Sequence, residues 1–397
     1  MPISLSTLPE ALRPRIGPDA PAPMRMMVAR ALLPMGPEDL FAALAYLVTN
    51  EQGPLKDAAQ NSLKEIPKGV IATALKGTQS VDLLDFTVRQ WHDDDGLVEA
   101  VLLNPLTSDD TFEWLARRAK GRALELISNN QARIIRHGAI VEAVFYNPEA
   151  SMALVNRVFE TGVRNGLSLE HIPGYKEIYE SIFGKKPEAR TTAQAQPAQQ
   201  TLDPELEPEL QTELLVDETF TRDELVVGVD DDDFVKLLSA VAQEEDPRAP
   251  VSDGKGETSN LGALVLKMSV PQKIRLALMG NQTARGLLIK DPKNTVAMAV
   301  LRNQRITEKE VAGFAKNKAM SDQVIQAICR NREWTRSPLV QKSLLHHPKT
   351  PPMFINRSIR SLSVKELKDL SKSREVPGYV SRLAKGVLAQ REAGKKG

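Results

Sequence analysis

Apolar positions recur at helical spacing along most of the chain. In each stretch an apolar residue is followed by others three and four positions later, and polar residues fill the remaining positions. A helix of about ten residues with a single apolar stripe is not stable alone, so neighbouring helices must cover each stripe. The pattern therefore predicts an all-α protein of stacked short helices. Clear examples are Phe112 with Leu115 and Ala116, Val311 with Phe314 and Ala315, and Val324 with Ala327 and Ile328.

The expected helix starts recur at a short and nearly constant interval. They fall near residues 67, 80, 95, 108, 121 and 134, and again near 281, 294, 307, 321, 335, 350, 363 and 376. Several carry a capping box, in which a hydroxyl and a Glu, Asp or Gln three positions later satisfy free backbone groups. These are Thr107 with Asp110, Ser269 with Gln272, Thr307 with Glu310, and Ser363 with Glu366. Asparagines stand at several expected helix ends, where we predict the left-handed conformation that Asn tolerates; they are Asn104, Asn130, Asn303, Asn317 and Asn331.

One short phrase occurs twice, about two hundred residues apart. The chain reads AVLLN at residues 100–104 and AVLRN at 299–303, and Asn147-Pro148 corresponds to His347-Pro348. Residues 100–150 and 299–350 therefore look like two copies of one unit. Repetition of short helical units is the sequence signature of an α-solenoid.

These motifs resemble a known class of repeat proteins. The helix ends LLNPLT, YNPEAS and HHPKTPP are similar to those of HEAT-like and leucine-rich-variant repeats, and LKDAAQNSLKEIP (55–67) resembles the second helix of a HEAT unit. The layout also resembles an uncharacterised bacterial family with two such modules. The resemblance implies an armadillo-type superhelix that presents an extended binding surface.

Composition divides the chain into segments. We predict a disordered lead at residues 1–23, an N-terminal helical-repeat module at 24–184 and a basic C-terminal module at 258–392, with a short tail at 393–397. Between the modules, residues 185–257 read as an acidic flexible linker because apolar residues are few and Pro, Gln and Glu are many. One amphipathic helix is expected inside this linker, near 231–244. Its apolar side chains are Phe234, Leu237, Leu238 and Val241, framed by carboxylates, which makes it a candidate to dock in a groove of the basic C-terminal module.

A formal net charge of +1 conceals a strong asymmetry. Residues 1–187 hold 20 Lys+Arg against 23 Asp+Glu, residues 188–257 hold 5 against 19, and residues 258–397 hold 27 against 9. The last segment thus has a net charge of +18, which must produce a positive surface. We expect the surface to include the exposed cations near the helix ends, which are Arg302, Arg305, Lys309, Arg330, Arg332, Arg336 and Lys342.

No catalytic or metal-binding motif emerges from the sequence. The five histidines lack zinc-ligand spacing, and His92 before three aspartates reads as a polar helix start. Cys329 lies on an apolar helix face, as a buried structural thiol would. The segment DGKGETS (253–259) lacks the spacing of a phosphate-binding loop, and the run Asp230 to Asp233 lacks the closing glutamate of a calcium loop. We therefore expect no enzyme activity, no metal and no other cofactor.

The sequence favours a cytoplasmic interaction protein. It has one cysteine and no apolar run long enough for a signal peptide or a membrane span. We predict a non-catalytic scaffold or adaptor that binds a protein partner of acidic character, or its own acidic linker, on the solenoid surface. The alternative is a nucleic-acid-associated protein that contacts phosphates through the basic C-terminal module.

Overall fold

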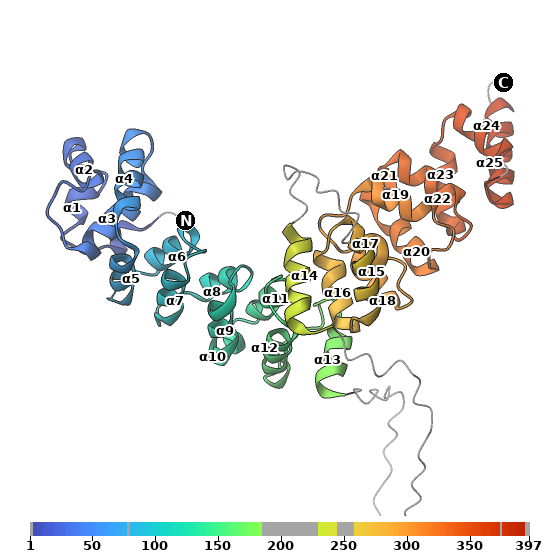
Figure 1. The fold of residues 1–397 in the computed structure, drawn as a ribbon. Helices are drawn as coiled ribbons and strands as arrows, with labels where there is room; N and C mark the ends of the chain where they lie inside the picture. Colours follow the sequence, from blue (N-terminus) through green and yellow to red (C-terminus); the bar gives the residue numbers. More distant parts are fainter. Residues whose placement is uncertain (1–2, 78–79, 185–228, 244–257, 374, 394–397) are drawn as a thin grey trace, which may run out of the picture.

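The computed structural model of the protein describes residues 3–77, 80–184, 229–243, 258–373 and 375–393. Every regular element among these residues is a helix, which confirms the all-α class. The helices follow one another in an elongated row, with the first ones at one end and the last ones at the other (Figure 1). We call residues 24–184 the N-terminal half and residues 258–393 the C-terminal half.

The N-terminal half and the residues before it contain one short 3-10 helix and thirteen α-helices. These elements are η1 (Leu5–Thr7), α1 (Arg13–Ile16), α2 (Ala22–Ala29), α3 (Pro37–Asn50), α4 (Pro54–Glu65), α5 (Lys68–Gly77), α6 (Val81–Gln90), α7 (Asp95–Leu103), α8 (Asp109–Ala116), α9 (Gly121–Asn129), α10 (Gln131–Arg136), α11 (Ala139–Phe145), α12 (Met152–Arg164) and α13 (Tyr175–Phe183).

The remaining helices belong to the described part of the chain after residue 228. They are α14 (Asp231–Gln243), α15 (Thr258–Lys267), α16 (Val270–Met279), α17 (Gln282–Leu288), α18 (Asn294–Val300), α19 (Glu308–Lys316), α20 (Asp322–Arg330), α21 (Arg332–Arg336), α22 (Pro338–His346), α23 (Pro352–Ser361), α24 (Val364–Lys372) and α25 (Gly378–Ala393).

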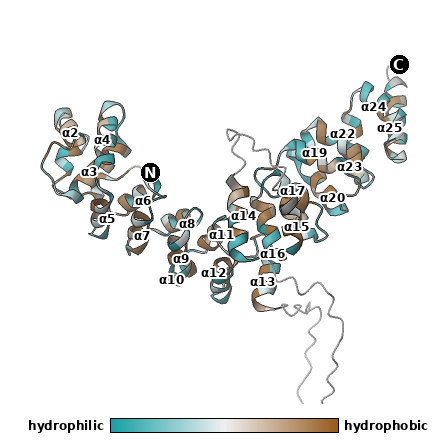
Figure 2. Ribbon diagram, in the orientation of Figure 1, coloured by the Kyte–Doolittle hydropathy of each residue, from teal (hydrophilic) through white to brown (hydrophobic). Residues whose placement is uncertain are grey.

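Alternate helices contact one another along the row. In the N-terminal half α3, α5, α7 and α9 pack in succession, and so do α6, α8 and α11; in the C-terminal half α16, α18 and α20 pack in the same way. Figure 2 shows that the helices carry both hydrophobic and hydrophilic residues, as single-stripe helices must. One cluster of buried side chains runs from Ile3 to Leu344, and a second covers Leu345 to Leu388. The hydrophobic core therefore continues from one half into the other.

Residues 3–23 differ from the disordered lead that we expected. They include η1 and α1, and the side chains of Ile3, Leu8, Leu12 and Ile16 are buried. Asn50 at the end of α3 holds Ile3 on both sides, because its Oδ1 accepts from the Ile3 N–H at 3.2 Å and its Nδ2 donates to the Ile3 carbonyl at 2.7 Å. The few apolar residues of segment 3–23 are therefore sufficient to order it, although prolines interrupt them, and α3 supplies the contact at Asn50.

Most predicted helix caps are present. Ser269, Thr307 and Ser363 form capping boxes with Gln272, Glu310 and Glu366. The cap expected at Thr107 was wrong by one residue, because Ser108 caps α8 while the Thr107 hydroxyl donates to the Val101 carbonyl.

The asparagines at helix ends do not adopt the left-handed conformation that we predicted. Asn104 has φ −77° and ψ 124°, and among the described non-glycine residues only Ala31 has a positive φ. The amide side chains of Asn104, Asn147 and Asn303 instead turn inward and bind backbone groups. They are buried, and each donates to a carbonyl at the end of an earlier helix, at Leu75, Ala116 and Ala277 respectively.

His347 makes the same contacts with an imidazole ring. Its Nε2 lies 3.1 Å from the Asn317 carbonyl, and its Nδ1 accepts from the Lys349 N–H at 3.1 Å. Asn104, Asn147 and Asn303 likewise accept from the N–H two positions later. We call these four residues the turn clamps. They explain the repeated phrase physically, since each copy needs a buried side chain that both donates and accepts at this position.

Candidate anion-binding surface

The two halves meet at the side chain of Arg275 in α16. This side chain is completely buried and donates to three carbonyls of the turn between α11 and α12: Phe145 at 3.1 Å, Ala150 at 2.8 Å and Asn147 at 2.8 Å. Burial lowers the pKa of the guanidinium to about 9, so the group still carries its charge at neutral pH. A buried arginine whose donors are satisfied by fixed carbonyls is a geometrically demanding contact. It therefore fixes the C-terminal half against the N-terminal half.

Helix α14 covers this junction. The side chains of Phe234, Leu238 and Val241 are buried, whereas Leu237 is half-buried at the edge of the same cluster. The Phe234 ring lies against the Arg275 guanidinium, with its centroid 5.7 Å from Cζ. The apolar stripe that the sequence indicated is thus the face that packs on the junction. The flanking parts of the predicted linker, residues 185–228 and 244–257, lie outside the described residues.

Polar contacts tie α14 to both halves. The Asp231 carboxylate accepts from the backbone N–H groups of Met152 and Ala153 at the start of α12, at 3.3 and 2.9 Å. At the other end of α14, Arg305 of the C-terminal half donates to the Ala242 carbonyl at 2.7 Å. A carboxylate at one helix N-terminus and a cation at another helix C-terminus both complement the helix dipole.

All seven predicted surface cations are exposed. Arg302 and Arg305 lie in the turn after α18, Lys309 is in α19, Arg330 ends α20, Arg332 and Arg336 begin and end α21, and Lys342 is in α22. None of the seven forms an ion pair with a residue that the structure describes. The hydrogen bonds from Ser363 are the main cause of the lowered pKa of the Glu366 carboxyl, and the nearby charge of Lys342 adds to it. We call these seven residues the basic surface. Among the described residues no carboxylate pairs with any of the seven, and Arg305 donates instead to the backbone carbonyl of Ala242 in α14.

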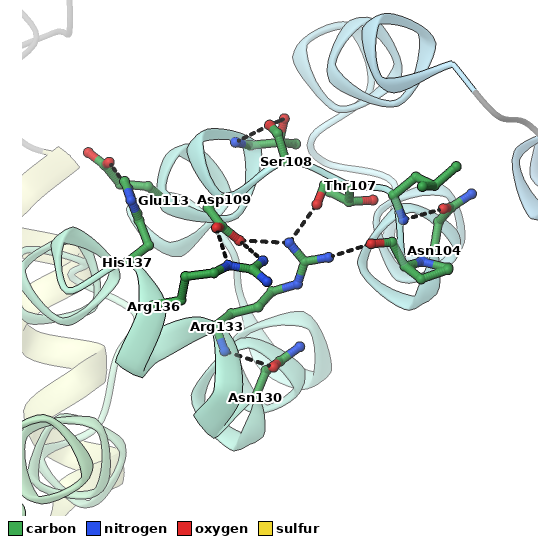
Figure 3. Close-up of polar contacts among 12 residues, drawn as sticks. Asn104, Thr107, Ser108, Asp109, Glu113, Asn130, Arg133, Arg136 and His137 are labelled. Atoms are coloured by element: carbon green, nitrogen blue, oxygen red, sulfur yellow. Dashed lines mark hydrogen bonds and ion pairs between the residues drawn. The ribbon is translucent and has the colours of Figure 1, made fainter. Parts of the chain in front are cut away.

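The cations of the N-terminal half have a different environment, because many are paired with carboxylates. Exposed examples are Arg122 with Glu99 at 2.8 Å, and Arg164 with Glu160 at 2.6 Å. Figure 3 shows the densest case, in which Arg133 and Arg136 both reach Asp109. The hydrogen bond from Arg136 does most to hold the pKa of the Asp109 carboxyl below its ordinary value. Burial opposes it, and the hydrogen bond from Arg133 adds to the lowering. These charges are neutralised locally, so they contribute less to the outer field.

Arg133 also donates hydrogen bonds to the backbone carbonyls of a turn, as Arg275 does. It donates to the carbonyls of Thr107 and Pro105 at 2.5 and 3.1 Å, in the turn that follows Asn104 (Figure 3). The turns after Asn104 and Asn147 are thus each held by one arginine. The first arginine comes from the same half, and the second comes from the other half.

The sequence analysis missed one group of possible metal ligands. Ligand atoms of Asp110, Glu113 and His137 lie within 4.8 Å of one another among the described residues, and His137 Nε2 is 2.8 Å from Glu113 Oε2 (Figure 3). The i, i+3 spacing of the two carboxylates is visible in the sequence, but the approach of a histidine from another helix is not. Acidic groups near the surface are common without a metal, and the hydrogen bond between His137 and Glu113 accounts for the contact.

Two further residues that the sequence singled out have ordinary structural roles. Burial raises the pKa of the Cys329 thiol to about 12, which is the opposite of what a nucleophile needs. The exposed His92 lies 3.5 Å from Asp93, and its ring stands perpendicular to that of Trp114 with centroids 5.8 Å apart. Nothing in the sequence indicated a functional role for Trp114.

No family model matches the chain, and neither a curated protein nor a solved structure matches it. Among the described residues, no helix has both the length and the apolar character that a membrane crossing requires.

Proposed function

We propose that the chain is a non-catalytic interaction scaffold of the α-solenoid class, with HEAT-like modules at residues 24–184 and 258–392, and that its basic surface binds an acidic protein partner. Successive packing of alternate helices and the recurrence of the turn clamps support the repeat architecture. Stacked repeats present extended surfaces rather than closed pockets, as binding of a protein chain requires. The single cysteine favours action in the cytoplasm.

One observation carries this proposal: the seven cations of the basic surface are exposed and form no ion pair with a described residue. An anionic partner that approaches exposed cations without counter-charges gains electrostatic energy. A phosphate backbone would meet the same charges, and a nucleic acid is therefore the alternative ligand class.

The test is a charge reversal in the full chain. The variant combines Arg302→Glu, Arg330→Glu and Arg332→Glu, and its matched control combines Arg122→Glu, Arg164→Glu and Lys176→Glu in the N-terminal half. Both variants change the net charge equally. The probe is a fluorescent peptide that copies residues 203–224, which hold nine acidic residues and one basic residue. We expect the first variant to bind the probe at least about tenfold more weakly, with the control unchanged. Equal affinities for the two variants would refute the assignment of the surface.

A further inference from the structure

Arginines and aromatic rings form a row of contacts in the N-terminal half. Its first centre is Trp114, a half-buried residue of α8. The Arg118 Cζ lies 4.4 Å from the centroid of the Trp114 ring, and the Arg89 Cζ lies 5.2 Å from it. A guanidinium group from α6 and one from the turn after α8 therefore meet at one indole ring.

The second centre is Tyr146, which directly precedes the turn clamp Asn147. The Arg117 Cζ lies 5.8 Å from the centroid of the Tyr146 ring. Arg302 of the C-terminal half is also close, because its charge acts on the Tyr146 hydroxyl, whose pKa is raised mainly by burial and by Glu142. The row thus leads from α6 through α8 and α11 across the junction to the basic surface.

The charges in this row are only partly compensated. Arg89 pairs with Asp85 at 2.7 Å, and Glu142 beside Tyr146 lies 3.3 Å from His171. Arg117, Arg118 and Arg302 are exposed, and none forms an ion pair with a described residue. Burial, followed by the neighbouring charges of Arg117 and Arg89, lowers the pKa of the Arg118 guanidinium. Adjacent cations that destabilise one another in the free protein are stabilised when a ligand supplies carboxylates.

We propose that Arg117, Arg118, Trp114 and Tyr146 form the energetic centre of the partner interface, and that they bind an acidic and partly apolar protein segment that continues onto the basic surface. This inference rests on the proposed function. Tryptophan, tyrosine and arginine are the residues that dominate binding energy at protein interfaces, in patches that are half-buried before binding. Carboxylates of the partner would bind the guanidinium groups, and its apolar side chains would pack beside the rings.

The same geometry disfavours a nucleic acid at this row. Single-stranded nucleic acids bind by stacking bases on open aromatic faces. The Trp114 ring already has Arg118 and Arg89 within cation–π distance and the His92 ring perpendicular to it. Part of the space that a stacked base would need is therefore already taken.

Two full-chain variants test this inference against one control. The first variant is Arg117→Ala with Arg118→Ala, and the second is Trp114→Ala. The control is Arg164→Ala with Phe183→Ala, which removes another arginine–aromatic contact, of 5.8 Å, whose arginine is paired with Glu160. Affinity for the peptide of residues 203–224 is measured by fluorescence anisotropy, and far-UV circular dichroism and thermal melting check that each variant is folded.

We expect the double arginine variant to bind at least about tenfold more weakly, with the control unchanged. If Trp114→Ala also lowers the melting temperature, only the double arginine variant is used to judge the inference. Its two side chains are exposed, so their removal should leave the fold intact. Unchanged binding by the arginine variant, together with weaker binding by the charge reversal at Arg302, Arg330 and Arg332, would overturn this inference and leave the proposed function standing. Unchanged binding by both would overturn both. If the double arginine variant lost affinity for a single-stranded oligonucleotide but kept its affinity for the peptide, the proposal that this row binds a protein segment would be overturned.

Discussion

The Arg275 side chain donates through Nη2 to the Asn147 carbonyl at 2.8 Å, although the two residues are 128 positions apart in the chain. Asn147 is itself a turn clamp, and its Nδ2 donates to the Ala116 and Ala119 carbonyls at 2.8 and 2.9 Å. The contact between the halves is therefore built on a turn that the N-terminal half already holds rigidly. A rigid junction keeps the arginine–aromatic row and the basic surface in a fixed relation.

Replacement of Arg275 by Ala should weaken the contact between the two halves, so that they unfold separately. It leaves the buried carbonyls of Phe145, Asn147 and Ala150 without their donors, and such losses cost about 3 kcal/mol or more. We expect a lower denaturant midpoint and two unfolding transitions in place of one. Arg133→Ala is the matched comparison, because Arg133 grips a turn inside one half and its loss should leave a single transition. A loss of less than about 0.5 kcal/mol in Arg275→Ala would contradict the role of the junction.

His347 should make the stability of the C-terminal half sensitive to acid. The Lys349 N–H donates to Nδ1, so the ring is neutral with its proton on Nε2, and burial is the main cause that lowers its pKa below 6.5. Because the folded pKa is the lower one, the unfolded chain binds the proton first as the pH falls. The contribution of neutral His347 to the free energy of unfolding is fully present above pH 6.5. It is lost as the pH falls from there through the pKa of His347 in the folded protein.

The variant His347→Asn tests this assignment, because asparagine is the natural residue at the other three clamps. We expect its free energy of unfolding to match that of the wild type at neutral pH. Between neutral pH and about pH 5 it should lose less stability than the wild type. Parallel pH profiles of the two proteins would show that the ring does not titrate as inferred.

The two leucines of α14 should respond differently to the same substitution. Leu238 is fully buried whereas Leu237 is half-buried, so Leu238→Asp places a carboxylate in the core and Leu237→Asp places one at its edge. We expect Leu238→Asp to expose residues 231–243 to limited proteolysis while the helical circular dichroism of the halves persists. Leu237→Asp should have a smaller effect. Equal resistance of both variants to the protease would mean that α14 is not held by its apolar face.

Core truncation in α20 tests the assignment of its buried face. The side chains of Val324 and Ile328 are both fully buried, so Val324→Ala or Ile328→Ala should each lower the free energy of unfolding by about 2–4 kcal/mol. Chemical denaturation measures the loss. Gln326→Ala is an exposed control on the same helix and should change stability by less than about 0.5 kcal/mol.

The sequence predicted local features well because local chemistry determines them. The apolar stripe placed Val324 and Ile328 in the core, and the hydroxyls of Thr307 and Ser363 capped α19 and α24. It was wrong about asparagine conformation, because the buried amides of Asn104 and Asn303 are used for long-range hydrogen bonds rather than for a left-handed turn. Nothing local distinguishes these two uses of the same residue.

Long-range relationships were not visible in the sequence for the same reason. Arg275 reads as one basic residue among many in a basic segment, yet it is completely buried, because its partners are carbonyls supplied by another part of the chain. Trp114 lies in α8 and Tyr146 directly follows α11. Arg118 is four positions from Trp114, but the approach of Arg89 to Trp114 and of Arg117 to Tyr146 depends on the packing of these elements. The exposed residues of the basic surface, in contrast, could be listed from charge and helix ends alone.

The most direct measurement is a titration of the full wild-type chain with two labelled probes side by side, the acidic peptide of residues 203–224 and a short single-stranded DNA, at low and at physiological salt. We expect the peptide to bind more tightly than the DNA at physiological salt, and we expect higher salt to weaken but not abolish its binding. Tighter binding of the DNA, or no binding of the peptide at either salt concentration, would contradict the claim that the protein is a scaffold for an acidic protein partner.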